Sequence, residues 1–138
     1  MESASIIEST LGCTPVPMPK LRELNNGDAA GMTLSEAARI QNPEPKSGLL
    51  DWRPYTNAET WREMTQRTAS ALANIRSREV ETAIVVGHGN FGQALIQTWL
   101  KLPLQLEVSF RFDVASITEL RTNDWDEREI VRLNSHHA

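Results

Sequence analysis

Residues 83–90 read Ala-Ile-Val-Val-Gly-His-Gly-Asn, and the residues that follow, 91–100, carry their apolar side chains at helical spacing. A continuous β-branched run such as Ala83–Val86 is typical of a strand that is buried on both faces of a parallel sheet. The order of strand, glycine-rich turn and helix therefore predicts an α/β fold.

The turn Gly87-His88-Gly89 lies where open α/β sheets bind their ligands, at the carboxyl end of a strand. Its glycines allow a tight turn, and the first amides of the next helix, at Gly89 and Asn90, favour an anion such as phosphate or carboxylate. His88 is thus a candidate catalytic residue, and Gly89 and Asn90 are candidate phosphate-binding residues. The alternative is a buried histidine that is satisfied by a backbone carbonyl at the turn.

The remaining chain shows the patterns of further helices and of one hairpin. Helices are expected over 3–11, over 33–40, where Thr33 and Glu36 form a capping box, and over 58–78. Three prolines predict an extended segment over 14–19, and an ordered loop is expected over 21–31. Strands over 114–121 and 129–133 flank a polar turn, which predicts a hairpin. With no repeat and no linker, 1–138 is expected to form a single domain.

The composition excludes several classes of partner. The 14 basic and 18 acidic residues are scattered along the chain, give a net charge of -4 and form no basic block, so nucleic-acid binding is not expected. No apolar run approaches the ~20 residues needed to span a bilayer, so no membrane association is expected. The single Cys13 and the lack of a cationic leader predict a cytoplasmic protein.

Glu23 is the second candidate catalytic residue. It lies in the loop over 21–31, where a carboxylate could act as a general acid if burial favoured its protonated form. The alternative is a loop glutamate that is solvated or paired with an arginine.

Five landmarks in order along the chain resemble the histidine phosphatase superfamily, which includes the cofactor-dependent phosphoglycerate mutases. They are Leu21-Arg22-Glu23-Leu24 with Gly27 and Gly31, similar to a Leu-x-Glu loop; Glu59-Thr60 with Arg67, similar to a Gly-Glu-Ser helix start; Val85-Val86-Gly87-His88-Gly89, similar to the second histidine motif; the late strand 116–120; and the closing Leu133-Asn134 with His136. The resemblance implies a phosphoglycerate mutase-like, mostly parallel sheet flanked by helices. It also implies phosphomonoester hydrolysis through a phosphohistidine, with Glu23 as proton donor and His88 in contact with the phosphoryl group.

The chain departs from the family pattern at its start. Family members begin with a strand that ends in Arg-His-Gly, whose histidine is phosphorylated, and neither this motif nor the second arginine of the family is found among the 138 residues. We therefore expect a domain that is incomplete at its N-terminus and a phosphatase that is inactive or impaired. The alternatives are a non-catalytic descendant that binds an anion or a protein, and a purely structural role.

The resemblance also implies the partners. A small phosphorylated metabolite or phosphate is the expected ligand, and no metal or other cofactor is expected, because positive side chains stabilise the phosphoryl oxygens. The absent strand lies in the middle of the family's sheet, so its loss would leave the edge of Ala83–Val86 open. We therefore expect a homo-oligomer, or else a complex with a partner that supplies a strand.

Overall fold

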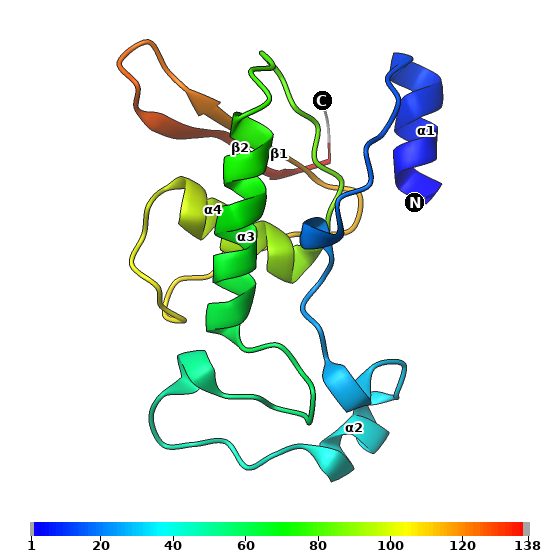
Figure 1. Cartoon of the computed structure of the whole chain (residues 1–138), viewed down its shortest axis with the longest axis vertical. Helices are drawn as coiled ribbons and strands as arrows, with labels where there is room; N and C mark the ends of the chain where they lie inside the picture. The colour runs from blue at the N-terminus through cyan, green and yellow to red at the C-terminus, as the bar shows by residue number, and fades with distance from the viewer. Residues whose placement is uncertain (1, 137–138) are drawn as a thin grey trace.

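The computed structural model describes residues 2–136 and has a mixed α/β architecture (Figure 1). Its described elements are, in order, the helices α1 (Glu2–Leu11), α2 (Leu34–Ile40), α3 (Trp61–Arg76) and α4 (Gly89–Trp99), and the strands β1 (Ile117–Thr122) and β2 (Arg128–Ser135). Single turns of 3₁₀ helix occur at Pro19–Leu21, Gly27–Ala29 and Leu49–Asp51. The α/β class expected from the sequence is confirmed. Within residues 2–136 no helix is both long and apolar enough to cross a membrane.

Two capping boxes fix where helices begin. Thr33 and Glu36 cap α2 reciprocally, as their spacing predicts. Thr60 and Glu63 do the same for α3: the Thr60 amide donates to Glu63 Oε2 at 2.8 Å, and the Glu63 amide donates to Thr60 Oγ1 at 3.2 Å. Since a capping box satisfies two amides that have no partner inside the helix, α3 begins at Trp61 and not at Ala58.

The core lies between α3 and α4. The buried stripe of α3 packs on the buried face of α4, and the fully buried side chains at their contact are Met64, Ala71, Phe91 and Ala94. Figure 1 shows α4 crossing behind α3, with α1 standing apart at the upper right. This crossing places the N-terminal end of α4 beside the loop that precedes residue 25, because Leu21 and Leu24 pack against the same core.

The expected hairpin is confirmed. β1 and β2 pair antiparallel, with Leu120 opposite Ile130 and with irregular register between Ile117 and Leu120. Asn123 orders the turn, since its Oδ1 accepts hydrogen bonds from the amides of Trp125 and Glu127 at 3.0 and 2.9 Å. This hairpin is the two-stranded sheet of the described residues.

The segment Ala83–Val86 differs from its prediction. It forms no strand, and 58% of Ile84 and 40% of Val86 are exposed, so the prediction of a strand buried on both faces was wrong. The parallel sheet implied by the resemblance is not formed by residues 2–136. The reason is physical: β-branched residues favour an extended backbone locally, but burial needs neighbouring strands, and the described part of the chain places none beside this segment.

Candidate active site

His88 occupies the position before α4. It is the N-cap residue of that helix, its backbone is extended (φ -131°, ψ 169°), and its side chain is exposed and makes no capping hydrogen bond. Gly87, which precedes His88, packs closely against the Phe91 ring, since a Cβ at position 87 would lie 3.1 Å from Phe91 Cδ1. The imidazole is therefore free to meet a ligand at the start of α4, and it is not the buried histidine of the alternative interpretation.

Glu23 reaches the same helix end from a distant loop. Its Oε2 accepts a hydrogen bond from the Asn90 amide at 3.1 Å, and its Oε1 accepts one from the Leu24 amide at 2.7 Å. The carboxylate thus lies at the positive end of the α4 dipole, which favours negative charge. Glu23 is half-buried and is neither fully solvated nor paired with an arginine through its carboxylate. The structure brings Glu23, His88 and Asn90 together.

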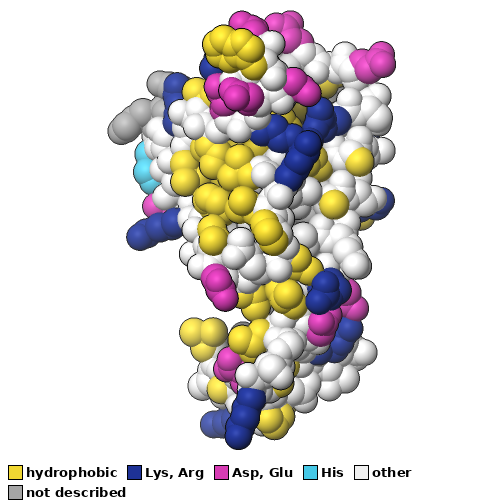
Figure 2. Space-filling model, turned by 90° about the vertical axis from the view of Figure 1, so that its left-hand side faces the viewer, with side chains coloured by type: hydrophobic (Ala, Val, Ile, Leu, Met, Phe, Trp, Pro, Cys, Tyr) yellow, Lys and Arg dark blue, Asp and Glu magenta, His cyan; other side chains and the backbone are white. Residues whose placement is uncertain are grey.

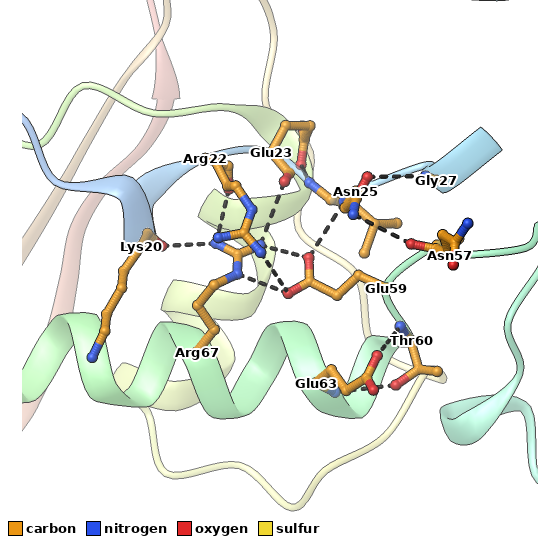
Figure 3. Close-up of polar contacts among 12 residues, drawn as sticks. Lys20, Arg22, Glu23, Asn25, Gly27, Asn57, Glu59, Thr60, Glu63 and Arg67 are labelled. Atoms are coloured by element: carbon orange, nitrogen blue, oxygen red, sulfur yellow. Dashed lines mark hydrogen bonds and ion pairs between the residues drawn. The ribbon is translucent and has the colours of Figure 1, made fainter. Parts of the chain in front are cut away.

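Arg67, on α3, holds the backbone of the Glu23 loop (Figure 3). Its Nη1 donates to the carbonyl oxygens of Lys20 at 2.7 Å and Arg22 at 3.0 Å, and its Nη2 donates to the carbonyl oxygen of Glu23 at 3.4 Å. One guanidinium therefore fixes three carbonyls within four consecutive residues. The planar fork of arginine suits this task, because it presents five donors in a rigid arrangement.

Glu59 binds the other side of the same guanidinium. Arg67 Nε donates to Glu59 Oε1 and Arg67 Nη2 to Glu59 Oε2, both at 2.7 Å, and both side chains are less than a tenth exposed. Burial acts to raise the pKa of Glu59, but hydrogen bonds and charge from Arg67 outweigh it, so the pKa lies below its ordinary value. Glu59 is thus a buried carboxylate that stays ionised because it is paired.

Glu59 also ties the loop to the start of α3 through its backbone. The Glu59 amide donates to the Asn25 carbonyl at 2.8 Å, and the Asn25 amide approaches Glu59 Oε2 at 3.3 Å. Asn25 in turn accepts from the Gly27 amide at 2.9 Å. Gly27 has φ +55°, and a Cβ there would lie 2.1 Å from the Thr56 carbonyl oxygen. Only glycine fits at position 27. The loop is therefore held at Asn25 by Glu59 and at Gly27 by its close contact with the backbone of Thr56.

The sequence prediction singled out Glu23, His88, Gly89 and Asn90, and it missed what holds Glu23 in place. Glu59 and Arg67 entered only as landmarks of a resemblance. The signal that could have indicated their pairing is their opposite charge together with their spacing, since Glu59 lies two residues before α3 and Arg67 lies in its second turn. The three carbonyl acceptors of Arg67 carry no sequence signal, because every residue has a carbonyl.

Comparison with known proteins identifies the family of this chain. The model of the histidine phosphatase superfamily (branch 1) matches residues 1–136. The chain belongs to this superfamily. It is the superfamily that the five landmarks in the sequence resemble.

Individual relatives agree with this assignment. The chain is 28% identical over 119 residues to an "Acid phosphatase" of Mycobacterium tuberculosis, which covers 72% of this chain and 57% of that protein. It is 30% identical over 122 residues to a "Probable phosphoglycerate mutase GpmB" of Erwinia tasmaniensis, covering 86% of this chain and 56% of that protein. The chain therefore spans a little over half the length of these curated relatives.

A solved structure shares the fold. It is titled as that of "a putative alpha-ribazole-5'-P phosphatase" from Escherichia coli, and it superposes with a TM-score of 0.69 at 19% identity. The match covers 99% of this chain and 70% of the other. At this identity the likeness concerns the fold.

Proposed function

We propose that this chain carries the proton-donor half of a phosphomonoesterase site. In this proposal the amides of Gly89 and Asn90 bind phosphoryl oxygens, His88 contacts the phosphoryl group, and Glu23 protonates the leaving oxygen. The substrate is a small phosphorylated metabolite in the cytoplasm. The hydrogen bond between the Asn90 amide and Glu23 Oε2, at 3.1 Å, is the observation that carries the proposal, because it places the Glu23 carboxyl at the helix end that follows His88. In the proposed complex the phosphoryl group displaces Glu23 from this amide.

The chemistry follows from the family. A histidine attacks phosphorus and forms a P–N bond while the P–O bond to the alcohol breaks, and the proton of Glu23 goes to the departing oxygen. Water then hydrolyses the phosphohistidine to phosphate. No Arg-His-Gly motif occurs among the 138 residues, so the polypeptide of this length binds the phosphoryl group but turns it over little or not at all.

A second candidate function is a non-catalytic domain that binds phosphate or another anion at α4. Both functions need the anion site, and they differ in turnover alone. A homo-oligomer belongs to either proposal, and the open edge at Ala83–Val86 supports it because unpaired strand edges promote association.

Binding of inorganic phosphate tests the shared site. In the structure the Glu23 carboxylate occupies the position of an anion at α4, so phosphate must compete with it. We expect Glu23→Gln to tighten phosphate binding severalfold, because one negative charge is lost, and His88→Ala to weaken it. Both are measured by amide shifts of Gly89 and Asn90 in an NMR titration. The proposal fails if these amides do not respond to tens of millimolar phosphate in either wild type or Glu23→Gln.

A further inference from the structure

An apolar cavity of about 290 Å³ lies between the start of α3, the excursion over 41–55 and the loop that follows α4. Its apolar lining consists of Leu24, Leu49, Trp52, Pro54, Trp61 and Leu106. Glu23, His88 and Asn90 do not line it, so the cavity is separate from the candidate anion site. Because an apolar cavity of about 150 Å³ already holds benzene, this one has room for a ring-sized molecule with a short substituent.

Polar contacts hold the excursion over 41–55 in place around the cavity. Asn42 brings its two ends together, since its Nδ2 donates to the Arg53 carbonyl oxygen at 2.9 Å. Two ion pairs then fasten the excursion to α3: Arg53 binds Glu63 at 2.7 Å, and Asp51 binds Arg62 at 2.6 Å. The wall of the cavity is therefore formed before a ligand arrives, which lowers the cost of binding.

The cavity joins two parts of the molecule. In Figure 1 the excursion and α2 form the lower part, below α3. Figure 2, which views the left-hand side of Figure 1, shows the molecule narrowing above this lower part, with hydrophobic side chains on both sides of the narrowing. Leu49 and Trp52 line the cavity from the excursion, and Trp61 lines it from α3. A molecule in the cavity therefore contacts both parts.

Trp52 and Trp61 carry two hydrogen-bond donors that the described chain does not use. The Nε1 atom of each indole is buried and has no hydrogen-bond partner within residues 2–136. A buried N–H without an acceptor is unfavourable, and native structures keep few of them. Both indoles line the cavity. A ligand with an acceptor oxygen can satisfy one of these donors while its apolar part packs on the rings.

The charged lining of the cavity disfavours anions. Glu44 and Glu59 are the charged residues among the described residues that line it, and neither is basic. A phosphate or carboxylate in this cavity would lie beside carboxylates without a compensating cation from the lining, which is costly away from water. The cavity is thus unsuited to a second phosphorylated ligand, and the unused indole donors call for an acceptor that carries no charge.

We propose that this cavity binds a small uncharged alcohol with an apolar body of about one ring. The oxygen of the alcohol accepts a hydrogen bond from the indole N–H of Trp52 or Trp61, and its body packs against the apolar lining. This inference does not depend on the proposed function, because it concerns a second site that shares no residue with the anion site at α4.

The test is an NMR titration of the 138-residue protein with benzyl alcohol, read at the indole N–H signals of its four tryptophans. We expect the signals of Trp52 and Trp61 to shift and that of Trp125 to stay, since Trp125 is 82% exposed and lies outside the cavity. Benzoate and benzylammonium are matched probes of similar size. Each should bind about tenfold more weakly, because benzoate meets the lining carboxylates and benzylammonium has no acceptor.

Protein variants locate the hydrogen bond and the cavity. Trp52→Phe and Trp61→Phe each remove an N–H and keep an aromatic wall, so at least one of them should weaken benzyl alcohol about fivefold without weakening toluene, which has no acceptor. Trp125→Phe is the matched control and should change neither affinity. Leu106→Trp fills the cavity and should abolish binding of both probes, whereas Leu34→Trp, at a position that is 92% exposed and outside the cavity, should not.

Five results would overturn the proposal. They are unchanged signals of Trp52 and Trp61 up to the solubility limit of benzyl alcohol, equally tight binding of benzoate or benzylammonium, undiminished binding of benzyl alcohol by both tryptophan-to-phenylalanine variants of the cavity, binding by Leu106→Trp, and displacement of benzyl alcohol by inorganic phosphate. The last result would make the cavity part of the anion site. The amide shifts of Gly89 and Asn90 with phosphate test the proposed function separately, so either idea can fail without the other.

Discussion

The Glu23 carboxylate accepts a hydrogen bond from the Asn90 amide although 67 residues separate them in the chain. The contact depends on two supports: α4 supplies a free amide at its first turn, and Arg67 on α3 fixes the carbonyls around Glu23. Because α3 and α4 pack directly on each other, the two supports are joined by the core. The candidate site is therefore set by helix packing and not by the loop alone.

Catalytic turnover separates the two proposed functions. We expect the 138-residue polypeptide to show negligible hydrolysis of an aryl phosphate, because a proton donor alone accounts for only about 10²- to 10⁴-fold of acceleration. The measurement is release of phenolate by purified protein, with His88→Ala as the control for contaminating phosphatase. Turnover at rates usual for enzymes that disappears in His88→Ala would contradict the expectation.

Arg67 should stabilise the protein far more than other arginines on α3. Arg67→Lys keeps the charge but loses the fork that holds Glu59 and three carbonyls, so we expect the free energy of unfolding to fall by about 3 kcal/mol. Arg62→Lys is the matched control, since Arg62 also binds a carboxylate, that of Asp51, with two hydrogen bonds but at the surface. It should cost less than about 1 kcal/mol. Urea denaturation measures both, and equal losses would refute the assignment.

Gly27 should tolerate alanine less well than Gly31 does. Both glycines have positive φ, +55° and +82°, so each alanine pays a similar conformational penalty of about 1–2 kcal/mol. Only at Gly27 would the new Cβ also meet backbone, with the Thr56 carbonyl oxygen at 2.1 Å, whereas Gly31 has open space. The difference in thermal unfolding between the two variants isolates this steric effect. A Gly27→Ala variant as stable as Gly31→Ala would show that the loop can move away.

Local sequence patterns predicted local structure well. The capping box of Thr33 and Glu36 and the polar turn of the hairpin each act within a few residues, and each produced the expected element. The prolines over 14–19 kept this segment out of helix as far as Pro19, which begins a 3₁₀ turn. The capping box of Thr60 and Glu63 is an equally clear sequence pattern. It places the start of α3 at Trp61 and not at the predicted Ala58. Capping is local physical chemistry, so it can be read without a structure.

Pairing between distant segments could not be predicted in the same way. The residues of Ala83–Val86 favour an extended backbone, but their pairing and burial depend on strands that the described chain does not place beside them. The contact of Glu23 with Asn90 uses a backbone amide, which no side-chain pattern reveals. The family resemblance supplied the link between Glu23 and His88, and the structure supplied the clamp of Glu59 and Arg67.

Acid should weaken the protein through Glu59. Its pKa in the folded state lies below the ordinary value of 4.5, so the stability gained from the ionised pair is complete above about pH 4.5 and is lost as the pH falls through the folded-state pKa. Glu59→Gln should therefore lower the unfolding free energy at neutral pH and flatten its decline below pH 4.5. Unfolding at a series of pH values measures this.

The control for the acid experiment is Glu63→Gln. Glu63 also has a lowered pKa, chiefly from its hydrogen bond with Arg53, but it is exposed. High salt should suppress the pH dependence due to Glu63 and leave most of that due to Glu59, because buried pairs are screened much less. If salt changed the pH dependence of stability equally in Glu59→Gln and in Glu63→Gln, the ion pair of Glu59 with Arg67 would be open to solvent.

Self-association should follow from the open edge at Ala83–Val86. Val80, Ile84 and Val86 are 55%, 58% and 40% exposed, and the backbone between them lacks strand partners in the described chain, so two copies can pair edge to edge. We expect a homodimer or larger oligomer at micromolar concentration, measured by light scattering coupled to size-exclusion chromatography. Ile84→Lys should shift the population toward monomer, because a charge on an edge opposes pairing, whereas Val114→Lys should not. A wild-type monomer of 15.5 kDa that unfolds cooperatively would contradict the prediction, since the chain would then have covered this edge itself.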